Sequence, residues 1–206
     1  MNKQTAKLIA RIVENLPDMT PDVMQGWIEN PRGLSRVLAE ALCPPKEVVE
    51  FPVWKTIKLG THKSVDELRQ SLRDNGFPIS CRAGNILGKI TLAETETEVT
   101  LHVATVEELT GKDVATNHEI NQAIRQKGYD LCPAEVGPQL RLQYSNQPEC
   151  ENLLIVMESI SDSFLGLRNI FCMGHAAGGE RWLNDCSGHP DHGWGDVYCF
   201  VFMSRK

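Results

Sequence analysis

The chain has 206 residues, of which 41% are apolar and 23% are charged, and its formal net charge is −6. This length allows one large domain or two small ones, each with a core of its own. The excess of negative charge disfavours non-specific binding to nucleic acid or to an anionic membrane, so we expect neither as a partner.

Export is not indicated by the N-terminus. Residues 1–16 are charged and amphipathic, without the continuous apolar segment of a secretion signal. No stretch approaches the roughly 20 apolar residues that a membrane span requires. Seven cysteines cannot all pair within one chain. We therefore predict a cytoplasmic protein with reduced thiols.

Residues 1–45 are predicted to form a helical module. The first segment carries an apolar stripe with helical spacing at Leu8, Ile9, Ile12, Val13 and Leu16. Thr20 followed by Pro21 is a typical helix start. The buried face of this second helix is predicted at Val23, Trp27 and Ile28. A third helix follows Asn30-Pro31, and Pro44-Pro45 predicts an extended linker.

Residues 46–206 have the pattern of an α+β domain. A strand at 51–59 precedes Ser64, which with Glu67 predicts a capping box at the start of a helix. A short helix is predicted at 79–87. The strand at 99–104 alternates apolar and polar residues, which places His102 on its exposed side.

A further helix begins at Thr116, again with a glutamate three residues later. Strand, capped helix, and glycine followed by an aromatic residue thus occur twice, so 51–88 and 97–144 are a possible β-α duplication. The alternative is that any β-α unit closed by a glycine would give the same pattern.

Four more strands are predicted at 139–144, 153–157, 169–173 and 197–203. The last of them is apolar on both faces, which is typical of a central, buried strand. The predicted fold class is therefore α+β. A helical N-terminal module is followed by a mixed or antiparallel sheet with helices on one face.

Four phrases mark a resemblance that covers nearly the whole chain. They are MQGWIENP at 24–31, VWKTIKLG at 53–60, LCPAEVGPQLRLQY at 131–144, and a C-terminal pattern of WL, GHP, W and FVF. Together they resemble a family of uncharacterised bacterial proteins. The resemblance implies no activity, cofactor or catalytic residue. In that family the positions of His175 and Trp194 are more typical than cysteines at 172 and 186.

Cysteine and histidine are concentrated at the C-terminal end. Cys172 with His175 and Cys186 with His189 repeat the spacing C-x-x-H. Zinc takes four thiolate or imidazole ligands, commonly from two short-spaced pairs, and Gly178-Gly179 would let the connection fold back. The sequence thus offers a possible zinc site. The alternative is that the thiols belong to the core and the histidines to loops.

The same segment allows a thiol enzyme. Cys186 has His189 and His192 as possible bases, and Cys132 precedes a Pro-Ala-Glu sequence that would open a helix. Neither cysteine has an evident orienting partner. The sequence also lacks the glycine-rich nucleotide motifs, the H-E-x-x-H zinc motif and the G-x-S-x-G nucleophile motif.

Charged and aromatic residues offer two possible binding sets. Glu135 in a loop and Arg141 on the polar face of a strand would bind a carboxylate or phosphate, unless they are only a surface pair. An exposed platform for a partner would be formed by Trp182, Trp194, His189 and His192. The alternative is that the two rings belong to the core.

The leading hypothesis is a non-enzymatic binding or interaction module. It would use the C-terminal Trp/His loops to bind a protein or a small ligand, without a cofactor. The competing hypothesis is a zinc-dependent or thiol enzyme that uses the same loops. An enzyme needs a concave pocket with convergent polar groups, whereas a binding module needs only an exposed patch or groove.

Overall fold

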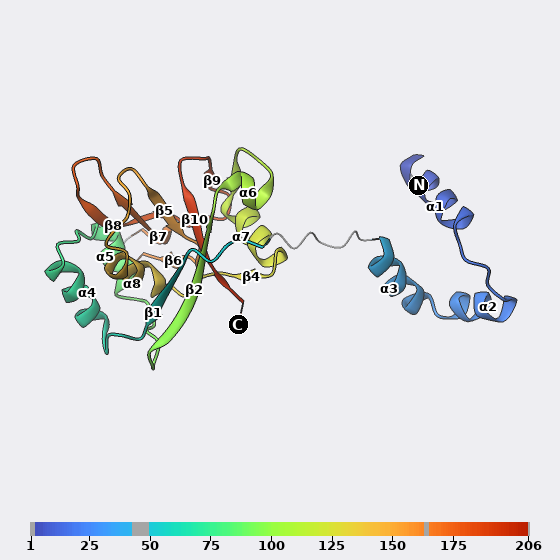
Figure 1. The fold of residues 1–206 in the computed structure, drawn as a ribbon, viewed down its shortest axis with the longest axis horizontal. Coiled ribbons are helices and arrows are strands. Elements are labelled where there is room, and N and C mark those ends of the chain that lie inside the picture. Colours follow the sequence, from blue (N-terminus) through green and yellow to red (C-terminus); the bar gives the residue numbers. More distant parts are fainter. Residues whose placement is uncertain (1–2, 43–49, 163–164, 206) are drawn as a thin grey trace. The chain divides into compact units, whose positions relative to one another are not determined.

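The computed structural model of the protein describes residues 3–42, 50–162 and 165–205. Contacts divide the chain into two compact units, Met1–Glu47 and Val48–Lys206. Each unit is described by itself, and Figure 1 labels their elements. Within the described residues, no helix is both long enough and apolar enough to cross a membrane.

The N-terminal unit consists of α1 (Lys3–Glu14), α2 (Pro21–Glu29) and α3 (Pro31–Leu42). As predicted, the Thr20 hydroxyl caps α2 by accepting a hydrogen bond from the amide of Val23, with proline in the first turn. Neither α1 nor α2 contains a buried residue. The prediction that Val23 and Ile28 are buried is therefore wrong, because their exposed fractions are 48% and 69%.

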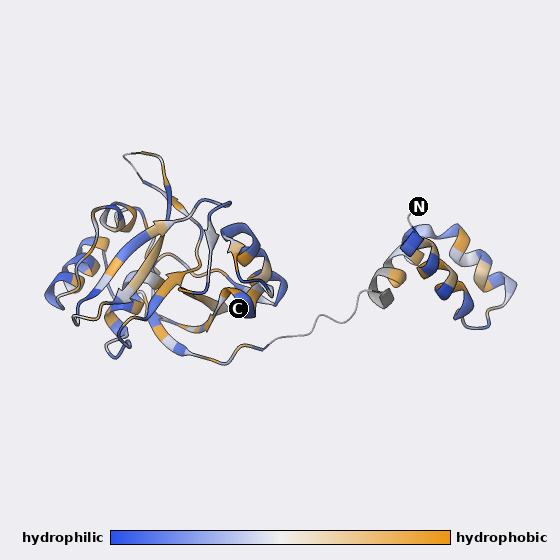
Figure 2. Cartoon of the chain, turned by 90° about the horizontal axis from the view of Figure 1, so that it is seen from above, coloured by the Kyte–Doolittle hydropathy of each residue, from blue (hydrophilic) through white to orange (hydrophobic). Residues whose placement is uncertain are grey.

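Apolar residues nevertheless run along these helices, as the hydropathy colouring of Figure 2 shows. Leu8 and Ile9 of α1 are 52% and 46% exposed. The helical period was readable from the sequence, but a period does not specify what covers the stripe. Within its described residues, the unit builds no core around α1 and α2.

The second unit alternates helices and strands. In chain order its elements are β1 (Lys55–Leu59), α4 (Val65–Asp74), α5 (Cys81–Leu87), β2 (Thr97–Ala104), α6 (Val106–Thr110), β3 (Ala115–Thr116), α7 (Asn117–Gln126), β4 (Tyr129–Asp130), α8 (Val136–Gln143), β5 (Asn152–Ile155), β6 (Ile160–Ser161), β7 (Arg168–His175), β8 (Arg181–Ser187), β9 (Gly193–Trp194) and β10 (Cys199–Ser204). The α+β class predicted from the sequence is confirmed.

The main sheet has the order β1-β2-β10-β5-β7-β6, with β4 added beside β10 and β8 beside β7. The pair β10–β5 is parallel and the other pairs are antiparallel, so the sheet is mixed. Strand β10 lies in the middle, as expected from its two apolar faces. A separate ribbon joins β3 to β9.

Helices lie against both faces of this sheet, which differs from the prediction of one covered face. The register places Phe171 and Val201 on one face of the sheet. On that face Gly137 of α8 packs closely on Phe171, since a Cβ added to Gly137 would lie 2.8 Å from the Phe171 ring. Phe200 points to the other face, where it meets Trp194, which in turn is bonded to Asn117 of α7. In Figure 1, α4, α5 and α8 gather at one end of the sheet and α6 and α7 at the other.

Two segments differ from their predicted structure. Residues 139–144, predicted as a strand, belong mostly to α8, in which six consecutive residues from Val136 to Arg141 are buried. A helix buried on all sides has no polar stripe, so its period cannot be read. Residues 181–185, predicted to belong to the connection between the two C-x-x-H pairs, lie in β8, which pairs with β7 along its whole length.

His102 is also placed differently from its prediction. Its side chain is 3% exposed, with Nδ1 at 3.0 Å from the carbonyl oxygens of Phe51 and Pro52 and Nε2 at 2.8 Å from the hydroxyl of Ser204. The chain before β1 covers this face of β2, a tertiary contact that alternation within the strand could not reveal. The possible β-α duplication stays a prediction.

Candidate functional site

The predicted zinc ligands are brought together only in part. Cys172 on β7 and Cys186 on β8 lie on neighbouring antiparallel strands, and their sulfurs are 2.7 Å apart. His175 instead directs Nδ1 at the carbonyl of Gln147, at 2.7 Å. His189 is exposed, and its imidazole lies 3.9 Å from the Asp191 carboxylate.

Across residues 3–42, 50–162 and 165–205, no three His, Cys, Asp or Glu side chains are placed to share a metal ion. A structural zinc site takes four such ligands, and a catalytic zinc site takes three and a water. The structure therefore supplies a pair of adjacent thiols where the spacing predicted two thiols and two imidazoles.

The C-terminal Trp/His loop is anchored to the start of α7. Asn117 and His118 donate their backbone amides to the carbonyls of His192 and Pro190, both at 3.0 Å. Trp194 is 6% exposed and donates its indole N–H to the Asn117 side chain at 2.7 Å. The loop carbonyls thus satisfy the free amides of a helix N-terminus, and the Trp194 ring belongs to the core.

The other members of the predicted platform do not complete it. His192 is exposed and meets the edge of Trp194, with ring centroids 4.5 Å apart. Trp182 is half-buried, and its indole lies so close to Gly174 that a Cβ there would overlap the ring. The two tryptophans thus fill space inside the domain, and of the four predicted platform residues only His189 and His192 are exposed.

Glu135 is an internal anchor rather than part of a surface pair. It is 1% exposed, and its carboxylate accepts hydrogen bonds from the amides of Gly60 and Ala93, both at 2.7 Å. Gln139 donates a third bond at 3.0 Å. The carboxylate therefore joins the start of α8 to two separate loops, and it has no accessible surface for a ligand.

Arg141 is fully buried on the same helix. Its guanidinium donates to the carbonyl of Tyr144 at 2.7 Å and to the side chain of Gln147, and it stacks 4.8 Å from the ring of Phe77. Burial, and then the charge of Arg181, lower the pKa of Arg141 to about 10, so it stays protonated at neutral pH. Glu135 and Arg141 thus have separate partners and do not form the predicted anion site.

No hydrogen bond between described residues joins either thiol-enzyme candidate to a histidine. Cys132 is buried, its sulfur lies 3.6 Å from the carbonyl of Val201, and burial raises the pKa of its thiol. Cys186 has a second sulfur as its neighbour, where the prediction placed an imidazole. The Cys–His pairing predicted from sequence spacing is therefore not formed.

Comparisons of this chain with protein-family models, with curated proteins and with solved structures found no match.

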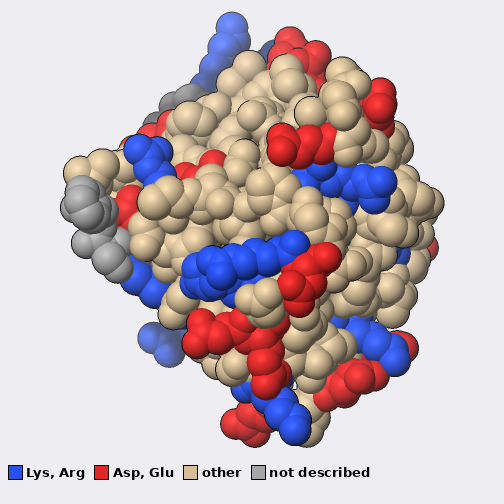
Figure 3. All heavy atoms as spheres, turned by 90° about the vertical axis from the view of Figure 1, so that its left-hand side faces the viewer, with Lys and Arg blue, Asp and Glu red and all other residues tan. Residues whose placement is uncertain are grey.

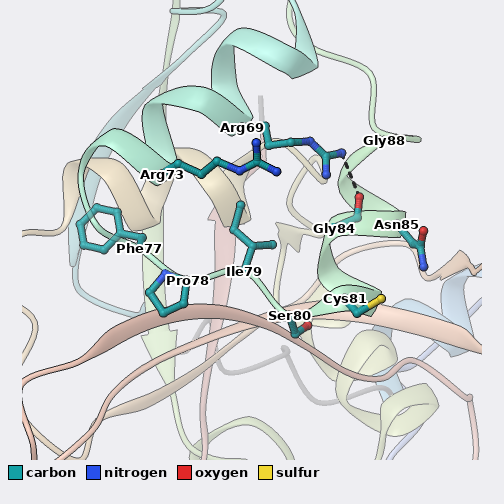
Figure 4. A pocket seen from close by; sticks show the side chains of 10 residues that line it. All are labelled: Arg69, Arg73, Phe77, Pro78, Ile79, Ser80, Cys81, Gly84, Asn85 and Gly88. Atoms are coloured by element: carbon teal, nitrogen blue, oxygen red, sulfur yellow. Dashed lines mark hydrogen bonds between the residues drawn. The ribbon is translucent and has the colours of Figure 1, made fainter.

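A pocket that the sequence analysis did not anticipate lies between α4 and α5. Its volume is about 490 Å³, and its walls include Arg69, Arg73, Phe77, Ser80 and Asn85. Figure 4 shows the two arginine side chains reaching from α4 across the pocket towards α5. Phe77 stands at the end nearest Arg73, and Ser80 marks the beginning of α5.

The wall of this pocket is fixed by β8. The amide of Leu183 donates to the carbonyl of Pro78 at 3.0 Å, and Ser80 returns a bond to the carbonyl of Leu183 at 3.2 Å. The Ser80 hydroxyl caps α5 and donates to Asp185 at 2.8 Å. Residues 78–80 therefore extend the sheet by a short parallel bridge, which holds the pocket wall in place.

Positive charge gathers in the pocket without a matching acid. Arg69 donates to the carbonyl of Gly84 at 3.0 Å, and Arg73 is exposed at the C-terminal turn of α4. None of the ion pairs between described residues includes either guanidinium. Figure 3 looks onto the end of the unit that carries α4 and α5, where Lys and Arg side chains form groups separated by Asp and Glu.

One signal in the sequence pointed to this site. Arg69 and Arg73 are four residues apart, so they share the outer face of α4 once Leu68 and Leu72 are assigned to the core. The segment 78–80 that closes the pocket carries no comparable signal, because its place is set by pairing with a strand more than one hundred residues away.

Proposed function

We propose that the protein is a binding module for a small organic anion, which it holds in the α4–α5 pocket. The observation that carries the proposal is the pair of arginines, Arg69 and Arg73, directed into one cavity with no acidic partner among the described residues. The ligand class is a phosphate or carboxylate attached to an aromatic or apolar group. This proposal keeps the binding class expected from the sequence and moves the site away from the C-terminal loops.

Charge is the first argument for an anion. Two guanidiniums four residues apart on a helix repel each other, and a bound anion removes that repulsion. Guanidinium forks match the oxygens of phosphate and carboxylate, and hydrogen bonds to charged groups are worth about 1.5–3 kcal/mol each. Because the chain has a net charge of −6, most of its surface repels anions, so an anion would bind preferentially in a locally positive cavity.

The shape of the pocket supplies the second argument. A volume of about 490 Å³ lies within the roughly 300–1,000 Å³ typical of small-molecule sites. Phe77 is an aromatic residue of the pocket wall, and its ring also stacks on the buried guanidinium of Arg141. Asn85 adds a neutral hydrogen-bonding group, whereas the Ser80 hydroxyl already donates its proton to Asp185. The combination suits a ligand with one anionic end and one flat, apolar end.

The test is direct ligand titration of the full-length protein. Phenyl phosphate, benzoate and inorganic phosphate serve as anionic probes, and benzyl alcohol serves as a neutral probe, with calorimetry and thermal shift as readouts. We expect phenyl phosphate to bind and to raise Tm, with inorganic phosphate weaker and benzyl alcohol without effect. Added salt should weaken the binding of the anions.

Matched arginine variants distinguish the pocket from general electrostatics. Arg73→Gln should weaken phenyl phosphate by about tenfold or more, which corresponds to about 1.4 kcal/mol. Arg82→Gln removes the same charge from an exposed position on α5 outside the pocket lining, and it should bind like the wild type. Equal weakening in both variants, or no binding of any anionic probe by the wild type, would overturn the proposal.

A further inference from the structure

Cys172 and Cys186 form a thiol pair that the proposed ligand site does not use. Cys172 lies opposite Asn184 in the β7–β8 ladder, and Cys186 lies opposite Ile170, so the two cysteines are diagonal neighbours on one face of the sheet. Their sulfurs are 2.7 Å apart, within an ångström of the roughly 2.05 Å of a disulfide bond. The ladder continues on both sides of the pair, so the backbone already holds the two sulfurs together.

The two thiols differ in access. Cys172 is 2% exposed, whereas Cys186 is half-buried and can be reached from the surface. Among the six cysteines that the structure describes, no other pair shares a sulfur–sulfur contact. Cys81 and Cys150 are exposed without a second sulfur beside them. Because of this difference in access, an oxidant would reach the Cys186 sulfur first, and the Cys172 sulfur would react with Cys186 from inside the domain.

We propose that Cys172 and Cys186 are a redox-active pair that peroxide converts into a reversible disulfide, with Cys186 attacking first and Cys172 resolving. The site is separate from the anion pocket and stands without it. The oxidant is a peroxide, a small molecule that can reach a half-buried thiol.

The electronic state of the pair agrees with this order. The hydrogen bond between the two sulfurs lowers the pKa of Cys186, and the same hydrogen bond together with burial raises the pKa of Cys172. The accessible sulfur of Cys186 therefore loses its proton more readily than the buried sulfur of Cys172. Thiolates, and not thiols, are the nucleophiles in this chemistry.

The reaction balances with one peroxide per pair. The Cys186 thiolate attacks one peroxide oxygen, an S–O bond forms, the O–O bond breaks, and hydroxide leaves and takes up the proton that Cys186 released. Cys172 then attacks the sulfenic sulfur of Cys186, the S–S bond forms, the S–O bond breaks, and the second hydroxide leaves as water with the Cys172 proton. The two sulfurs are oxidised by two electrons in total, and the peroxide is reduced to two waters.

The test is peroxide oxidation of the full-length protein followed by peptide mass analysis without reductant. We expect one cross-linked peptide that joins residues 172 and 186, with the loss of two hydrogen atoms, and its disappearance after treatment with dithiothreitol. Cys81→Ser, which removes an exposed lone thiol, should give the same cross-link. The proposal fails if both thiols stay free under conditions that oxidise Cys81, or if Cys186 joins another cysteine.

Single variants test the order of attack. Cys172→Ser should accumulate a sulfenic acid at Cys186 that dimedone traps, whereas Cys186→Ser should leave Cys172 unlabelled because it is buried. Equal dimedone labelling of Cys186 in the first variant and of Cys172 in the second would contradict the assigned roles. If the serine variant does not fold, Cys172→Ala serves in the same assay, because it places no hydroxyl in the core. The cross-link in the wild type tests the disulfide itself and does not depend on any variant.

Discussion

The helices of the N-terminal unit and those of the α+β unit carry the same kind of apolar stripe but differ in what covers it. Leu68 and Leu72 of α4 are fully buried, whereas Leu8 and Ile9 of α1 are about half exposed. Helix α4 packs on α8, and α8 packs on the sheet. An amphipathic sequence thus specifies a helix, and the stability of that helix depends on the layers around it.

Core substitutions should show the largest difference between the two units. Phe171→Ala removes a fully buried ring that packs against Gly137, and it should lower the free energy of unfolding by about 3–5 kcal/mol. Leu8→Ala removes a half-exposed side chain and should change it by less than about 0.5 kcal/mol. Urea unfolding followed by circular dichroism measures both. A comparable loss in the two variants would mean that α1 is covered in solution.

Arginine substitutions should give the next largest difference. Arg141→Leu leaves the carbonyl of Tyr144 and the side chain of Gln147 without their buried donor, which should cost about 2–4 kcal/mol. Arg11→Leu in α1 breaks only an exposed ion pair with Glu14 and should cost less than about 1 kcal/mol. Chemical denaturation at constant pH compares them. Arg141→Lys keeps the charge and loses the fork, so its stability should lie between those of Arg141→Leu and the wild type.

The parts of the fold that depend on local chemistry could be predicted from the sequence. Thr116 and Glu119 form the expected capping box at the start of α7. Ser64 caps α4 as predicted, although Glu67 reaches back to the amide of Lys63, one residue before the capping residue. Alternation of apolar and polar residues correctly located β2, and a strand pattern that is apolar on both faces correctly located β10. In each case the residues that decide the structure are within a few positions of one another.

The parts that depend on distant segments could not be predicted. Glu135 and Arg141 read as surface charges, and they are buried because backbone groups of Gly60, Ala93 and Tyr144 satisfy them. Sequence spacing correctly gathered Cys172 and Cys186 into one region but could not show that their histidine partners point elsewhere. The α4–α5 pocket was missed for the same reason, since its wall is held by β8. Buried polar contacts between separate segments leave no periodic trace.

A tryptophan in each unit offers a smaller contrast. Trp194→Phe loses the hydrogen bond to Asn117 and leaves that buried amide oxygen without its donor, so it should cost about 1–3 kcal/mol. Trp27→Phe in α2 changes a half-exposed ring on a helix without buried residues and should cost less than about 0.5 kcal/mol. Thermal unfolding monitored at several wavelengths measures the two. A cost at Trp194 no greater than at Trp27 would show that the loop is not anchored through this contact.

Glu151 gives the smallest expected effect, and its sign depends on pH. Burial raises the pKa of Glu151 above 4.5 against the opposing hydrogen bonds of Tyr144 and Gln147, and Oε2 has no hydrogen-bond partner among the described residues. Ionisation therefore costs more in the folded state than in the unfolded state, so this contribution to stability is present below pH 4.5 and is lost as pH rises through the raised pKa. Glu151→Gln cannot ionise, so its stability relative to the wild type should increase between pH 4 and pH 7. Denaturation curves of both proteins at pH 4 and pH 7 measure this difference. If the stability of Glu151→Gln relative to the wild type falls over this range, the fold favours the ionised carboxylate.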